Sequence, residues 1–230
     1  MSFDLVIFDC DGVLVDSEVI SCQTHADVLS RCGYPITTDQ VFRRFLGRSL
    51  KQACVEIEAE LGHGLPDDFS AKLQAEMYSA FERDLQAING IADALDALTV
   101  PVCVASSGSH QRMRVSLGAT GLYDRLAPHI FSSSQVENGK PAPDLFLFAA
   151  AQMNAKPSAC VVVEDSSAGI RGGVAAGMTV LAIEHDMAFV RQVAQRVTVL
   201  HLGQVFAQGS IDEIVADERV AAIYLGQAHA

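Results

Sequence analysis

The sequence is poor in basic residues. Lysine and arginine together number 16 among 230 residues, against 28 aspartates and glutamates, and the formal net charge is −12 at pH 7. A nucleic-acid-binding surface needs clustered lysine and arginine, so this balance argues against a nucleic-acid partner. It leaves an anionic substrate open, because a bound cation can dominate the local field.

The sequence also lacks long apolar runs and C-x-x-C pairs. No run approaches the roughly 20 residues of a transmembrane helix, and the N-terminus lacks the basic region of a signal peptide. Several cysteines lie in short apolar runs, which favours buried free thiols over disulfides or metal ligands. A reducing compartment suits them. We therefore expect a cytoplasmic protein without a membrane partner, as a monomer or weak dimer.

Short apolar runs alternate with segments of helical length and pattern. The runs lie at residues 5–8, 102–105, 161–163, 180–183 and 197–200 and are rich in β-branched residues, as is typical of strands buried on both faces. Helical patterns occupy residues 111–117, 144–153 and 166–176. The alternation predicts an α/β fold with a Rossmann-like parallel sheet and right-handed crossovers.

Residues 16–89 break this alternation, because their pattern is helical throughout. Turn signals at residues 32–35 and 62–66 separate the helices. We predict an α-helical cap domain over 16–89, inserted into a core formed by residues 1–15 and 90–230, of which 184–230 is an atypical tail. The length suits one large or two modest domains.

Polar residues mark the ends of three predicted strands. Asp9 and Asp11 follow the first strand, Ser106 closes the second, and Glu164 and Asp165 follow the run at 161–163. Ligands of open α/β sheets bind outside the carboxyl ends of the strands, so we expect these carboxylates to converge. Like charges at close range repel unless a proton or cation intervenes, which predicts a magnesium site. Taken alone, Asp165 also fits a helix cap.

These residues resemble the motifs of the haloacid dehalogenase superfamily of phosphatases and phosphomutases. DCDGVLVDSE at residues 9–18 is similar to the first motif, and Ser106 to the second. Lys140 in GKPAPDLF is similar to the third, and VVVEDSSAG at residues 161–169 to the fourth. The helical insertion resembles the cap of the β-phosphoglucomutase-like and 6-phosphogluconate phosphatase-like branch. The resemblance covers about residues 1–181.

The resemblance implies a magnesium-dependent phosphatase that hydrolyses a small sugar or sugar-acid phosphate. Asp9 would be the nucleophile and form an aspartyl-phosphate, and Asp11 would act first as acid and then as base. Mg²⁺ would be held by Asp9, Asp165 and the main-chain carbonyl of Asp11, with Glu164 acting directly or through water.

The resemblance further implies that Ser106 and Lys140 contact the phosphoryl oxygens, with Ser107 and Gly108 as further substrate-binding candidates. Taken alone, these residues also read as turn residues, a surface lysine or the start of a helix. In the predicted cap, Arg48 is a candidate for substrate binding. It belongs to a basic cluster that fits either an anionic substrate group or a solvated helix face, and whose other members are Arg43, Arg44 and Lys51.

A sugar phosphomutase is the alternative function. Resembling mutases carry a cap histidine where alignment on DCDG places Ser21, which favours hydrolysis. His25 lies one turn later and could reach the site. A catalytically inactive interaction protein is a third possibility, which the filled catalytic positions argue against.

The segment from residue 184 onward departs from this family. It resembles the C-terminal end of an ABC-transporter ATPase subunit, with His185 in the place of the switch histidine. The chain has no G-x-x-x-x-G-K-[ST] phosphate loop, so we expect neither ATPase activity nor a catalytic role for His185. Predicted helices at 187–195 and 211–215 flank the run at 197–200, which could supply the last strand of the sheet.

Overall fold

The computed structural model describes residues 3–45, 49–184 and 186–224. It divides into two compact units, Met1–Ile183 and Glu184–Ala230. Among the described helices, none combines the length and the apolar character that crossing a membrane requires. The cap lies within the first unit, and its predicted boundary at 16–89 stays a prediction.

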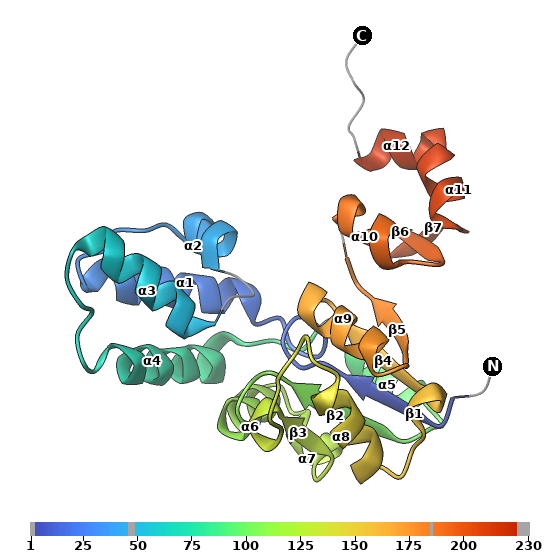
Figure 1. The fold of residues 1–230 in the computed structure, drawn as a ribbon, viewed down its shortest axis with the longest axis horizontal. Coiled ribbons are helices and arrows are strands. Elements are labelled where there is room, and N and C mark those ends of the chain that lie inside the picture. The colour runs from blue at the N-terminus through green and yellow to red at the C-terminus, as the bar shows by residue number, and fades with distance from the viewer. Residues whose placement is uncertain (1–2, 46–48, 185, 225–230) are drawn as a thin grey trace. The chain divides into compact units, whose positions relative to one another are not determined.

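The first unit is built on a five-stranded sheet (Figure 1). Its order is β3-β2-β1-β4-β5, and each neighbouring pair is parallel. The strands are β1 (Leu5–Phe8), β2 (Val102–Ser106), β3 (Ile130–Ser132), β4 (Cys160–Glu164) and β5 (Thr179–Ala182). This arrangement confirms the predicted α/β fold with a parallel, Rossmann-like sheet.

The alternation of side chains along β1 explains how the sheet is covered on both faces. Val6 and Phe8 pack in the same cluster as Met113 of α6 (His110–Ala119). Leu5 and Ile7 pack in a second cluster with residues of α8 (Asp144–Gln152). The other core helices are α5 (Ile91–Ala97), α7 (Tyr123–Leu126) and α9 (Ser167–Ala175). The core therefore holds the carboxyl ends of β1, β2 and β4 in fixed register.

The insertion between β1 and β2 is helical in its described part, as predicted. Its helices are α1 (Glu18–Arg31), α2 (Thr38–Phe45), α3 (Leu50–Leu61) and α4 (Phe69–Asp84), drawn in blue to green in Figure 1. The two connections to the core lie side by side. The Asp16 N–H donates to the Gln86 carbonyl at 3.0 Å, and the Ile88 N–H donates to the Leu14 carbonyl at 2.9 Å.

Two features of the main sheet differ from the sequence-based expectation. The apolar pattern does not predict β3, which has three residues. The run at 180–183 was expected to be buried on both faces, but β5 is the edge strand and Leu181 is 56% exposed. The described cysteines are free thiols, as predicted, and Cys10, Cys22, Cys103 and Cys160 are buried.

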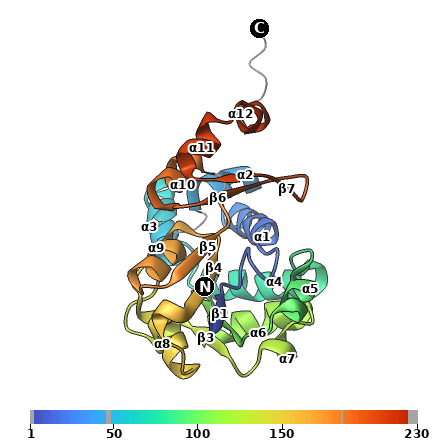
Figure 2. The same ribbon diagram turned by 90° about the vertical axis from the view of Figure 1, so that its right-hand side faces the viewer.

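The second unit contains α10 (Met187–Val193), β6 (Val197–His201), β7 (Gln204–Gly209), α11 (Ile211–Ala216) and α12 (Glu218–Tyr224), which are labelled in Figure 2. β6 pairs antiparallel with β7 in a separate two-stranded sheet. The prediction that residues 197–200 supply the last strand of the main sheet is therefore wrong. The hairpin satisfies the backbone of β6 locally, and Val199 is buried in a small cluster of this unit. His185 lies outside the described residues.

Candidate active site

Three carboxylates meet at the carboxyl edge of the main sheet. Asp9 directly follows β1, Glu164 ends β4, and Asp165 comes next. One oxygen from each carboxylate lies within 4.8 Å of the others. The Asp9 N–H donates to the Val163 carbonyl at 2.9 Å, which ties the ends of β1 and β4 together.

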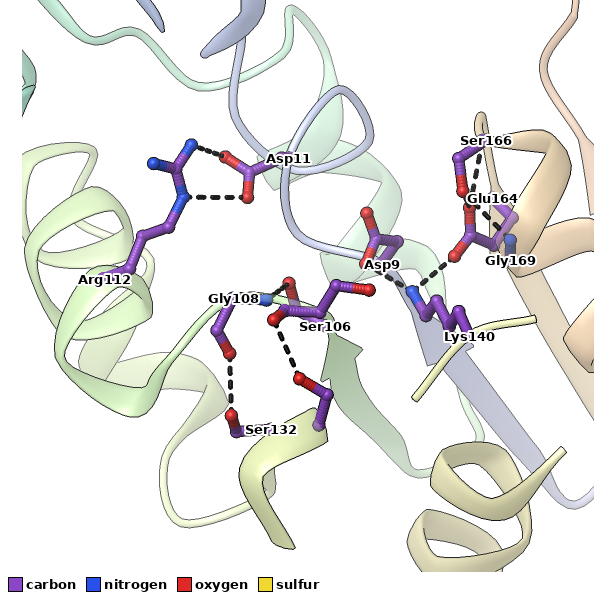
Figure 3. A network of polar contacts seen from close by, with 12 residues as sticks. Asp9, Asp11, Ser106, Gly108, Arg112, Ser132, Lys140, Glu164, Ser166 and Gly169 are labelled. Carbon is purple, nitrogen blue, oxygen red and sulfur yellow. Dashed lines mark hydrogen bonds and ion pairs between the residues drawn. The ribbon is translucent and has the colours of Figure 1, made fainter. Parts of the chain in front are cut away.

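Lys140 joins two of these carboxylates (Figure 3). Its Nζ donates to Oδ1 of Asp9 at 2.6 Å and also to Oε1 of Glu164. The Lys140 side chain is 3% exposed. Burial alone would lower the pKa of Lys140, but the two carboxylates outweigh it and raise the pKa above its ordinary value. Lys140 is therefore a buried ammonium at the centre of the site.

One ammonium does not balance three carboxylates. Burial raises the pKa of Asp9 to about 6 despite Lys140, with Glu164 adding to the rise. Burial and the charges of Asp9 and Glu164 raise the pKa of Asp165 to about 7. The cluster therefore carries repulsion that a further cation would relieve.

The donor set fits magnesium. The ligand atoms are hard carboxylate oxygens, which Mg²⁺ prefers, and opposite ligands of an octahedral Mg²⁺ lie about 4 Å apart. The 4.8 Å limit of the cluster is close to that span.

Glu164 is anchored from its other side. Its Oε2 accepts hydrogen bonds from the Ser166 N–H at 3.0 Å and the Ser166 hydroxyl at 2.9 Å. The Ser166 hydroxyl also accepts from the Gly169 N–H and caps α9. Ser166 is thus the capping residue of α9, and Asp165 is left to face the carboxylate cluster.

Gly12 makes room for Asp165. Its φ is +76°, and a Cβ on Gly12 would lie 1.7 Å from Oδ2 of Asp165. Asp165 therefore occupies the space that any side chain at position 12 would take. The glycine in DCDG serves both the left-handed turn and the metal-ligand candidate beside it.

We expect Gly12→Ala to lower both stability and activity, and Gly62→Ala to lower stability alone. Gly62 has nearly the same φ, +75°, but no atom lies within 4 Å of the position that a Cβ would take there. The left-handed strain should cost each variant about 1–2 kcal/mol in urea unfolding. In Gly12→Ala the methyl group also displaces Asp165, so phosphate release should fall at least ~10-fold at fixed magnesium. Equal activity in the two variants would contradict this account of Gly12.

Asp11 does not join the cluster, contrary to the expectation that all the acids converge. Its carboxylate pairs with Arg112, at 2.8 Å from Nη2 to Oδ1 and 3.2 Å from Nε to Oδ2. The Ser17 hydroxyl donates to Oδ1 at 2.5 Å. The reason is electrostatic. The guanidinium of Arg112 attracts the Asp11 carboxylate and donates two hydrogen bonds to it, whereas the crowded carboxylates of the cluster would repel it. Figure 3 shows Asp11 turned toward Arg112.

Ser106 ends β2 and is buried at the same edge. Its hydroxyl oxygen accepts a hydrogen bond from the Gly108 N–H at 3.1 Å, which leaves the hydroxyl hydrogen available to another acceptor. The carbonyls of Ser107 and Gly108 accept from Ser133 at 2.8 Å and from Ser132 at 2.7 Å. These bonds fix the loop that leads into α6.

Two arginines of the basic cluster in the cap form ion pairs. Arg43 pairs with Asp39 at 3.1 Å on an exposed surface, and Arg44 pairs with Glu56 and Glu60 at 2.8 and 2.5 Å. These contacts favour the solvated helix face over substrate binding. Arg48 lies outside the described residues.

His25 is bonded within its own helix. Its Nδ1 lies 2.7 Å from the Ser21 carbonyl oxygen, one turn earlier on α1, so Nδ1 donates to it. Burial is the main cause that lowers the pKa of His25. The bond from Nδ1 therefore orients the ring along α1.

Two site residues received no role from the sequence: Arg112, which lies outside the motifs, and Ser17, which lies within the first motif. The signal for Arg112 is topological. Helix α6 starts after Ser109, whose hydroxyl accepts from the Arg112 N–H, so Arg112 lies in the first turn beside the carboxyl end of β2. The signal for Ser17 is its place at the start of the cap, six residues beyond Asp11.

A family model described as haloacid dehalogenase-like hydrolase matches residues 6–183. The chain belongs to this family. It is 34% identical over 203 residues to the 6-phosphogluconate phosphatase of Escherichia coli, and the alignment covers 87% of this chain and 92% of that protein. The family match ends at the junction of the two compact units, and the resemblance of residues 184–230 to a transporter ATPase has no support from it.

Solved structures of the family share the fold. A haloacid dehalogenase-like protein from Agrobacterium tumefaciens matches with a TM-score of 0.73 and 38% identity, over 84% of this chain and 91% of that one. A hydrolase of the family from Deinococcus radiodurans, solved with bound phosphate and sodium, matches with a TM-score of 0.66 and 35% identity, over 78% and 80% of the two chains. These likenesses confirm the predicted hydrolase of the haloacid dehalogenase superfamily.

Proposed function

We propose that this chain is a magnesium-dependent phosphatase that hydrolyses a sugar phosphate or sugar-acid phosphate through an aspartyl-phosphate. The observation that carries the proposal is the grouping of Asp9, Glu164 and Asp165 around the ammonium of Lys140. A buried ammonium and a candidate cation site that share the Asp9 carboxylate suit the binding of a phosphoryl group. The similarity to a 6-phosphogluconate phosphatase supports the substrate class.

In the first step an Asp9 carboxylate oxygen attacks phosphorus, and the bond from phosphorus to the ester oxygen breaks. Asp11 gives its proton to the departing oxygen, which leaves as the alcohol of the sugar. The products are an acyl phosphate on Asp9 and an ionised Asp11. Splitting the transfer into two displacements at a carboxylate is a general strategy of covalent catalysis.

In the second step Asp11 takes a proton from water while the water oxygen attacks phosphorus. The bond from phosphorus to the Asp9 oxygen breaks, which releases inorganic phosphate. Asp9 returns as a carboxylate and Asp11 as the acid. Such acid–base help is typically worth ~10²–10⁴-fold in rate.

The remaining residues bind and stabilise the transferred group. Lys140 offers a compact positive charge beside Asp9, and Ser106 offers the hydroxyl hydrogen that its bond with Gly108 leaves available. Ser107 and Gly108 line the start of the same loop. These groups are preorganised, so they stabilise developing charge without rearrangement during the reaction.

Magnesium, when bound, neutralises charge on Asp9 and on the phosphoryl oxygens, so that two anions approach each other. Asp9, Asp165 and the main-chain carbonyl of Asp11 would hold it. Glu164 would contribute directly or through water, and its bonds to Ser166 and Lys140 hold its carboxylate in place.

The test is a phosphate-release screen over sugar phosphates, with and without magnesium. A sugar-acid phosphate and the polyol phosphate of the same carbon skeleton form a matched pair, which tells whether a substrate carboxylate matters. A β-hexose 1-phosphate distinguishes the alternative, because a mutase converts it to the 6-phosphate without releasing phosphate. We expect magnesium-dependent release from at least one sugar or sugar-acid phosphate. A folded protein that releases none, or that only isomerises the 1-phosphate, would contradict the proposal.

A further inference from the structure

We propose that Arg112 is a positioning residue, which holds the carboxylate of Asp11 on the cap side of the site and ties this position to the cap helices. The inference rests on the proposed function, in which Asp11 is the acid and base. It assigns a task to a residue of α6 that lies outside the catalytic motifs of the sequence.

The contact between Arg112 and Asp11 has the geometry of a specific pair. Two guanidinium nitrogens meet the two carboxylate oxygens, at 2.8 Å to Oδ1 and 3.2 Å to Oδ2. The side chains of Arg112 and Asp11 are 25% and 29% exposed, so water screens the pair little. Two-point pairs of this kind fix the plane and rotation of a carboxylate as well as its charge.

The direction of Asp11 suits in-line displacement. In phosphoryl transfer the attacking and leaving oxygens lie on opposite sides of phosphorus. An acid for the leaving oxygen therefore belongs beyond the phosphoryl group and not beside the nucleophile. The carboxylate of Asp11 lies outside the cluster of Asp9, Glu164 and Asp165 and is turned toward Arg112, which matches that requirement.

The cap holds Arg112 from the other side. The guanidinium carbon lies 4.8 Å from the ring centroid of Phe81, a fully buried residue of α4. Nη2 also reaches the hydroxyl of Ser21 on α1 at 3.4 Å. Ser17, at the entry to the cap, donates to Asp11 directly. The orientation of the acid is thus set by groups of the core and the cap together, and a properly seated cap is needed to hold it.

The pair leaves part of the Asp11 carboxylate open to a further partner. A carboxylate has about four lone-pair positions, of which Arg112 and Ser17 use three. Arg112 thus orients the group without removing it from the reaction.

The test is a double-mutant cycle in turnover between Arg112→Met and Asp11→Asn, measured with the best substrate of the phosphate-release screen. Methionine keeps most of the length of the arginine side chain and its packing against Phe81, but removes the charge and the hydrogen-bond donors. We expect Arg112→Met to lower kcat about 10–100-fold, the cost of a misplaced catalytic group, with KM within about threefold. In the Asp11→Asn background the same substitution should change kcat less than about twofold, because coupled residues act as a unit.

Two further variants separate positioning from folding. Arg112→Lys keeps the charge but loses the planar fork, and we expect an intermediate kcat with unchanged thermal stability. Arg125→Met is the matched control. It removes a guanidinium that pairs with Asp96 at 2.5 Å, far from the site, and kcat should stay that of the parent.

Each other outcome overturns the inference. An equal loss in the parent and Asp11→Asn backgrounds, with a raised KM, would show that Arg112 binds substrate directly. A gain in kcat for Arg112→Met would show that the pair restrains Asp11 instead of placing it. No change in kcat would show that the pair serves neither purpose. A parent protein that hydrolyses no phosphate ester would overturn the proposed function and this inference with it, whereas an active parent with additive effects overturns the inference alone.

Discussion

Asp9→Asn should abolish phosphate release while the protein stays folded. The amide oxygen is a poor nucleophile and cannot form the acyl phosphate, whereas the side chain keeps its size and its place after β1. We expect turnover to fall by at least ~10⁴-fold, beyond the share that a single acid or base contributes. The measurement is phosphate release at saturating magnesium, with circular dichroism to check the fold.

Asp96→Asn is the control for Asp9→Asn. It also removes a carboxylate that pairs with a cation, Arg125, but on an exposed surface away from the sheet edge. Its turnover should equal that of the parent. If the Asp9→Asn protein is folded and releases phosphate at more than about a hundredth of the parent rate, Asp9 acts by charge alone and another group is the nucleophile.

The parallel sheet could be predicted because its strands carry strong local signals. The runs that become β1, β2 and β4 are short, apolar and rich in β-branched residues, and β1 and β4 are buried almost throughout. The convergence of the polar residues at the strand ends then follows from topology, since parallel strands point the same way. The carboxyl ends of β1 and β4 meet as this reasoning predicts.

The missed strands lack such signals. β3 has only three residues and is defined by its pairing with β2, a contact that no local pattern reveals. β7 follows β6 through a two-residue turn at Leu202 and Gly203, both with positive φ. Asparagine or aspartate usually occupies the first position of that turn, and leucine there hides the hairpin.

The candidate site also has a part that the sequence predicts and a part that it does not. The acids and Lys140 could be predicted as site residues from motifs, because their residue types indicate phosphoryl chemistry. The direction of the Asp11 side chain could not, because its partner Arg112 is 101 residues away in the sequence. An acidic side chain goes to whichever cation the fold brings near, and this depends on how α6 meets the start of the cap.

Removal of divalent cations should abolish activity and lower thermal stability. Burial, together with the neighbouring carboxylates, raises the pKa of Asp9 to about 6 and that of Asp165 to about 7, so a bound cation would stabilise the charged forms of both groups. EDTA should lower turnover at least ~100-fold, and magnesium should restore it because its octahedral site uses few carboxylates plus water and phosphate. Calcium should restore little, because it favours looser and higher coordination.

A measurement of magnesium binding by thermal stability separates the binding of the metal from its effect on turnover. A ligand that binds only the folded state at a hundred times its Kd stabilises it by about 2.7 kcal/mol, which corresponds to a rise in Tm of about 5–10 °C for a chain of this size. We expect magnesium to raise the Tm of the parent and of Asp96→Asn by this amount. Asp165→Asn should lose most of the rise, because it removes one candidate ligand and the charge that draws the cation. Full turnover after exhaustive chelation would show that the reaction needs no cation and would leave Lys140 as the main positive charge on the phosphoryl group. An undiminished Tm rise in Asp165→Asn would place the cation elsewhere.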